Sequence, residues 1–426
     1  MKVSRITLPV FAFLLMSCSL IRPGAQRARQ VSTAPPDWPL AARQQLAEFD
    51  LMARNMRDLY IDPTKVDAKW QQKVDAIRAK FSETTTGDDG STLVRDLLAT
   101  LDDGNLQVTS QPNDGTSVVD PAIAGGLGVQ VDLPSKGHER VLVLSVSDGS
   151  AAQSAGIKAH DAIVSVDGRP VGNDPSILRR VRGRVGTQVV IGVQTPGRAA
   201  RDVTITRRAV SSASPTTGRM VPGTNYGLIQ PGLATLPDQL RGEVTTALRD
   251  LSKNRPLDGL VLDLRVMRGP DFPTEDLLAL FANRIVATRY VRGQAPSPFS
   301  RTAVAAGQVD LSGRNIDGSQ TVPLVILVGS LTNGQAEAFA GILQDLQRAI
   351  VVGNTTQGNP VILADVDLPT SGLRMRIPSA EYRTLKGVGW LKTGVIPNPI
   401  VETSWEEYTD DNDPVLKLAV DQLNKR

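Results

Sequence analysis

The sequence predicts a multidomain α+β protein with a helical amino-terminal domain, a small β-domain and a larger core that contains a βαβ unit. Apolar residues recur at helical spacing from Leu40 to Leu101, short β-type runs fill residues 124–208, and two apolar runs flank a helical pattern between 324 and 353. With 426 residues, 41% of them hydrophobic, the chain has enough material for two or three separate cores.

The amino terminus has the layout of a secretory signal. Lys2 and Arg5 precede an apolar stretch from Ile6 to Leu15, which is too short to span a bilayer. The single cysteine, Cys18, follows after Met16 and Ser17.

This segment resembles a lipoprotein signal, and the resemblance implies that Cys18 becomes the lipidated first residue. Ser19 is not acidic, which in a diderm bacterium implies an outer-membrane address facing the periplasm. We therefore expect residues 1–17 to be a signal peptide and residues 18–40, rich in proline, to be a tether. The alternative is that Cys18 is a buried or incidental cysteine without a lipid.

Residues 41–112 are predicted to form the helical domain. Its apolar positions are spaced three and four apart and include Leu46, Phe49, Met52, Met56, Leu59, Trp70, Val74, Ile77, Phe81, Leu93, Leu97 and Leu98. The domain ends in the segment Leu-Asp-Asp-Gly-Asn at 101–105.

Residues 123–208 are predicted to form the β-domain, with strands near 128–131, 141–146, 162–166, 189–193 and 203–206 and a helix near 175–181. The loop Gly126-Leu127-Gly128-Val129, the turn at 150–157 and the segment 161–168 together resemble a PDZ domain. The resemblance implies that backbone amides of this loop bind a peptide carboxylate while the peptide adds a strand to an exposed edge. A β-domain without a ligand is the alternative.

Residues 209–222 are predicted to be a linker, and residues 223–426 the core. Apolar runs at 259–265, 324–328 and 350–353 predict buried strands, and the ranges 236–251 and 336–346 predict helices. Nearly the whole chain after the tether resembles the C-terminal processing (tail-specific) serine proteases. The resemblance implies a ClpP/crotonase-like spiral for the core.

The catalytic segment departs from the family pattern. The family has Gly-Ser-Ala-Ser-Ala-Ser-Glu before Ala-Gly-Ala-Leu-Gln-Asp, with a serine nucleophile, an orienting Asp eleven residues later and a lysine general base twenty-five residues later. Alignment on Asp345 and Glu337 places Gly334 at the nucleophile position and Asn359 at the base position. Glycine has no hydroxyl and an asparagine amide cannot accept the proton, so neither can do the chemistry.

Two further departures lie elsewhere. Asn105 stands where the family segment Leu-Asp-Asp-x-His has histidine, and Pro270 stands in a Gly-Gly loop that in the family supplies an oxyanion amide. Proline has no N–H, so that donor is lost. Losing a nucleophile costs on the order of a millionfold in turnover, and losing one oxyanion donor about a hundred- to a thousandfold.

Composition excludes several other classes of function. One cysteine and two histidines, His138 and His160, offer neither an intrachain disulfide nor a zinc cluster, and no cofactor is expected. The formal charge is +3, and the only dense basic run, Arg179 to Arg184, has no interleaved aromatics, so we expect a solvated face and no nucleic-acid partner.

We therefore expect a lipid-anchored envelope protein that binds polypeptide C-termini or envelope proteins without cutting them. One alternative is an active serine peptidase of the same family that uses Ser330 or Thr332 as nucleophile. Another is a structural envelope protein with a silent PDZ groove. Gly334 also has a purely structural interpretation, a turn ahead of a helix capped by Thr332 and Gln335.

Overall fold

The computed structural model describes residues 35–110, 125–132, 140–171, 179–209, 215–233, 236–267, 269, 271–292, 306–311, 315–401, 405 and 413–426. Cys18, most of the expected tether and Pro270 lie outside these ranges. None of the helices in the described part of the chain is long and apolar enough to cross a membrane.

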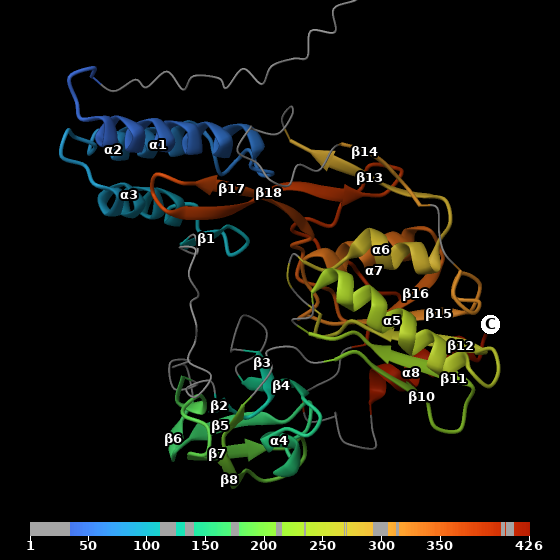
Figure 1. Cartoon of the computed structure of the whole chain (residues 1–426). Helices are drawn as coiled ribbons and strands as arrows, with labels where there is room; N and C mark the ends of the chain where they lie inside the picture. Colours follow the sequence, from blue (N-terminus) through green and yellow to red (C-terminus); the bar gives the residue numbers. More distant parts are fainter. Residues whose placement is uncertain are drawn as a thin grey trace, which may run out of the picture.

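The amino-terminal region is helical, as predicted, and contains α1 (Leu40–Leu59), α2 (Ala68–Arg78) and α3 (Gly87–Ala99). They do not bury a core of their own. Their apolar side chains form one cluster with the hairpin of β17 (Val361–Leu368) and β18 (Leu373–Arg383), near the other end of the sequence (Figure 1). The helical region and this hairpin are therefore one structural unit.

The hairpin belongs to a five-stranded sheet that joins distant parts of the chain. Its order is β1-β18-β13-β14, with β17 paired to β18. Its other strands are β1 (Gln107–Ser110), β13 (Ile285–Val291) and β14 (Gly307–Asp310).

The middle region is a compact β-domain that lies apart from the helices (Figure 1). Its main sheet has the order β3-β4-β5-β7-β8, so β3 is an edge strand. Its elements are β2 (Gly125–Gly126), β3 (Val129–Asp132), β4 (Val141–Val146), α4 (Ala151–Ser154), β5 (Ala162–Val166), β6 (Arg169–Pro170), β7 (Gln188–Gln194), β8 (Arg201–Thr206) and β9 (Arg208–Ala209). Of the predicted helix at 175–181, only residues 179–181 are described, and they form a 3₁₀ turn.

The core contains a sheet of order β10-β11-β12-β15-β16, in which the last four strands are parallel. Helices α5, α6 and α7 pack on one face and α8 on the other. These elements are β10 (Thr217–Met220), β11 (Tyr226–Gln230), α5 (Pro237–Ser252), β12 (Gly259–Asp263), α6 (Thr274–Phe281), β15 (Leu324–Val328), α7 (Gln335–Asp345), β16 (Ala349–Gly353) and α8 (Pro414–Leu423). This confirms the predicted βαβ unit, β15-α7-β16, and with it the mixed α and β class.

Candidate peptide-binding and peptidase-like sites

Gly334 lies where β15 turns into α7, with φ +66° and ψ −142°. A Cβ atom built there would lie 2.2 Å from the carbonyl oxygen of Gly269. That distance is far inside van der Waals contact, and the positive φ disfavours any side chain. The backbone at the aligned nucleophile position therefore has no room for a serine unless the Gly269 loop moves.

Glu337 holds the segments around Gly334 together. Its side chain is completely buried, and its carboxylate accepts hydrogen bonds from the amides of Gly334 (3.1 Å), Asn359 (2.8 Å) and Gly358 (2.6 Å). Thr356 Oγ1 donates a fourth bond at 2.5 Å. Burial raises the pKa of Glu337, and these four donors oppose that rise. The capping partner of Gly334 is thus Glu337, and the predicted Thr332–Gln335 cap is wrong.

The loop at Gly269, which faces Gly334, also makes hydrogen bonds within the protein. The Gly269 amide donates to Asn333 Oδ1 at 2.8 Å, and Asn333 Nδ2 donates to Gln357 Oε1 at 2.7 Å. The Gly269 N–H is therefore satisfied within the protein and is not directed at a ligand.

The aligned positions do meet in space. Gly334, Asn359, Asn105 and Gly269 all line one small cavity of about 200 Å³. The positions singled out in the sequence, Gly334, Asn359 and Asn105, thus lie at one cavity, and none of the three carries a hydroxyl or an amine.

The remaining candidates lie elsewhere. Asp345 is exposed at the carboxyl end of α7, eleven residues from Gly334 and hence about 16 Å along the helix axis, so it does not orient any group in the cavity. Thr332 is fully buried, and its hydroxyl donates to the Leu264 carbonyl at 2.8 Å and accepts from the Gly329 amide at 2.9 Å. Ser330 is exposed and is not among the residues that line the cavity. Neither hydroxyl has a general base in contact within the described structure.

The β-domain loop is organised differently. The carbonyls of Leu127 and Gly128 accept bonds from the amides of Ala152 (2.9 Å) and Ser147 (2.8 Å). In the described part of the chain, the amides of Leu127 and Gly128 donate to no acceptor. These two amides directly precede the edge strand β3, and neighbouring backbone amides arranged in this way can bind a terminal carboxylate.

Side chains around this loop fix its shape. Gly128 has φ +76°, and a Cβ there would lie 2.4 Å from Ser150 Cβ. The Leu127 side chain is buried in the core of the β-domain, whereas Val129 is only partly buried at its margin. Leu127 therefore supports the loop from the domain core, and Val129 alone of the two is partly exposed beside the loop.

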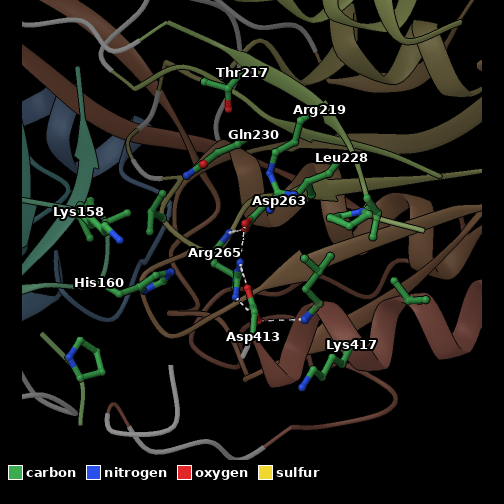
Figure 2. A pocket seen from close by; sticks show the side chains of 18 of the residues that line it. Lys158, His160, Thr217, Arg219, Leu228, Gln230, Asp263, Arg265, Asp413 and Lys417 are labelled. Atoms are coloured by element: carbon green, nitrogen blue, oxygen red, sulfur yellow. Dashed lines mark hydrogen bonds and ion pairs between the residues drawn. The ribbon is translucent and has the colours of Figure 1, made fainter. Parts of the chain in front are cut away.

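A second polar cluster, which the sequence did not predict, lies between the β-domain and the core (Figure 2). It lines a cavity of about 860 Å³. Arg265 Nη2 forms ion pairs with Asp263 at 2.7 Å and Asp413 at 2.8 Å, and His160 approaches from the β-domain. Burial, and then the charge of Arg265, lower the pKa of His160. The sequence gives no sign of this cluster, because His160, Arg265 and Asp413 are each more than 100 positions apart.

The carboxy-terminal segment adds a further contact to the same interface. Trp405 Nε1 donates to the His160 carbonyl at 2.8 Å, and the Arg140 guanidinium lies 4.6 Å from the Trp405 ring centroid. A hydrogen bond and a cation–π contact therefore attach the β-domain to the carboxy-terminal part of the chain.

Comparisons with known proteins give matches for both the core and the β-domain. Residues 232–401 match the peptidase family S41, and residues 125–206 match the PDZ domain. A carboxyl-terminal-processing protease of Synechocystis is 28% identical over 353 residues, covering 78% of this chain and 76% of the relative. Another from Picosynechococcus is 28% identical over 395 residues, covering 89% and 90%. The photosystem II D1 C-terminal processing protease structure has a TM-score of 0.56 at 24% identity, covering 84% of this chain and 93% of that one, and shows the same fold.

Proposed function

We propose that this chain, which belongs to the C-terminal processing peptidase family and carries that family's PDZ domain, binds polypeptide C-termini without cutting them. The observation that carries the proposal is Gly334, where a side-chain carbon would collide with the Gly269 carbonyl at 2.2 Å. A nucleophile cannot occupy this backbone, and a catalytic serine needs both a place and a base.

The binding half of the proposal rests on the loop before β3. Its Leu127 and Gly128 amides are free in the described structure, and among the described strands β3 pairs only with β4. A peptide strand can hydrogen-bond along β3 while its terminal carboxylate takes the two amides. The partly buried Val129 beside the loop favours an apolar last residue.

The experiment measures binding and turnover on the same protein. Calorimetry compares a peptide that ends in a free carboxylate with its amidated form, and a fluorophosphonate probe reports any activated serine. We expect binding of the free acid only and no labelling. Equal binding of both peptides would reject the carboxylate loop, and a probe adduct at Ser330 would establish an active peptidase. Absence of any binding would leave a structural protein with a silent groove.

We also propose that the protein is a lipoprotein of the bacterial envelope, held to the outer membrane through Cys18 and facing the periplasm. The support is the order of charged, apolar and cysteine residues at the amino terminus. Cys18→Ala should move the protein from the membrane to the soluble fraction. A wild-type chain that is soluble and processed at another residue would contradict this proposal.

A further inference from the structure

The PDZ domain carries a concentration of positive charge close to its carboxylate loop. We call Arg179, Arg180, Arg182 and Arg184 the arginine segment; all four side chains are exposed. In the described structure, none of the four guanidinium groups has an ion-pair or hydrogen-bond partner. Unpaired, exposed charges of one sign are typical of a surface that meets a partner of opposite charge.

Backbone hydrogen bonds fix the arginine segment beside the loop. Gly125 and Gly183 exchange two bonds, at 2.9 Å and 3.0 Å, as an isolated antiparallel bridge. Gly183 lies between Arg182 and Arg184, and Gly125 directly precedes the loop at 126–129. The approach is so close that a Cβ on Gly125 would lie 2.6 Å from the Gly183 carbonyl oxygen.

The segment is held from behind by a buried arginine. Arg207, which is 7% exposed, donates to the carbonyls of Arg180 (2.6 Å) and Val181 (3.0 Å) and to that of Gln188 (2.7 Å). This side chain uses its fork of donors to fix the backbone of the arginine segment, so the exposed guanidinium groups extend from a rigid support. The surface is thus ordered before any ligand arrives.

We propose that the arginine segment selects polypeptide C-termini that carry acidic side chains just before an apolar last residue. This inference rests on the proposed function, because it concerns the ligand of the same groove. A peptide strand on β3 ends at the loop, which brings its last side chains next to Gly125 and within reach of the long arginine side chains. Peptide is favoured over nucleic acid because no aromatic side chain lies in residues 179–186 to stack on bases.

The experiment is a binding matrix on the full mature protein. Two peptides end in the same valine and carry either two Glu or two Gln directly before it, and each is made as free acid and as amide. At low salt we expect the Glu peptide to bind about tenfold more tightly than the Gln peptide, with the difference shrinking in high salt. Amidation should remove binding of both.

Variants separate the arginine segment from general charge. Arg182→Gln with Arg184→Gln should reduce the Glu preference to about twofold or less. Arg198→Gln is the matched control, because Arg198 is exposed in the turn after β7, about 20 Å along that strand from residue 188, and should leave the preference unchanged.

The outcomes distinguish the two proposals. Equal binding of Glu and Gln free acids, with amidation still abolishing it, would overturn the acidic preference and leave the proposed function standing. Failure of every free acid to bind would overturn both. Vesicles of phosphatidylglycerol and phosphatidylcholine provide a third arm: arginine-dependent binding to them, without peptide preference, would show a lipid contact and overturn the inference.

Discussion

The two candidate sites of this chain use their polar groups in opposite ways. Around Gly334, four donors converge on Glu337, and the Gly269 amide is taken by Asn333. Around Gly128, two amides remain free in the described structure and the neighbouring arginines have no partner. A site that has satisfied its own donors gains stability but loses capacity for a ligand, whereas a binding site keeps donors ordered and available.

The largest effect should come from removing the Glu337 carboxylate, which accepts four internal hydrogen bonds. Glu337→Ala leaves two buried amides, one partly buried amide and a buried hydroxyl without this acceptor, so the free energy of unfolding should fall by about 4 kcal/mol. Chemical denaturation measures it, with the exposed Asp250→Ala on α5 as control. If Glu337→Ala lowers the free energy of unfolding no more than Asp250→Ala does, the Glu337 carboxylate does not hold the surrounding segments together.

Gly334→Ser together with Asn359→Lys tests directly whether the backbone at Gly334 can accept a side chain. The serine Cβ meets the Gly269 carbonyl and the backbone has φ +66°, so we expect a loss of about 3 kcal/mol and no turnover of casein. Gly242→Ser is the control, because nothing lies within 4 Å of a Cβ at that position. Wild-type stability with measurable cleavage would mean that the loop opens easily, and the comparison between the two sites would fail.

Gly128→Ala should damage the open site. The new methyl group collides with Ser150 Cβ at 2.4 Å and strains a residue with φ +76°, so we expect a loss of about 2 kcal/mol and loss of peptide binding. Gly149→Ala shares the positive φ, at +68°, but meets nothing within 4 Å. It should cost less stability and retain binding, as calorimetry can check. Equal peptide affinity in Gly128→Ala would move the binding site elsewhere.

The smallest effect concerns the interface cluster. His160 faces Arg265, Asp263, Asp413 and Asp161, and its pKa is lowered from 6.5 by burial and by Arg265. The unfolded chain therefore binds a proton more readily than the folded chain, so stability should fall as pH decreases through about 6.5.

His160→Gln should flatten this dependence of the melting temperature between about pH 7.5 and pH 5.5. His138→Gln, at the chain's other histidine, is the control. An unchanged slope in His160→Gln would show that carboxylates alone set the pH response of the interface.

Local patterns predicted most of the elements, because each depends on its own residues. The strand at 259–263, the helix α7 and the β-domain strands follow from period and turn residues alone. The alignment also predicted which positions meet at the cavity, since Gly334 and Asn359 both line it. The predicted helix at 336–346 also implies that Asp345 lies about 16 Å along the helix axis from Gly334, so its distance from the cavity could have been predicted as well.

Contacts between distant parts of the chain could not be predicted from the sequence. The capping role of Glu337 depends on segment 356–359, and the cluster of His160 with Arg265 and Asp413 joins three parts of the chain. The arginine segment was interpreted as a solvated face, and only the Gly125–Gly183 bridge shows that it borders the carboxylate loop. The expected independent domain at 41–112 likewise shares its core with a hairpin hundreds of residues away.

That shared core governs the order in which the molecule can be completed. The Glu48 carboxylate accepts from the Thr370 and Ser371 amides across 322 and 323 positions, and Phe49 and Met52 pack in the cluster that the hairpin closes. At about 5–20 residues per second, a ribosome needs roughly 15–60 seconds to make the intervening chain. During that time the apolar faces of α1 to α3 lack their cover. The helices are thus synthesised first but can complete their core only after the hairpin has been made, and they are a segment that a chaperone would need to protect.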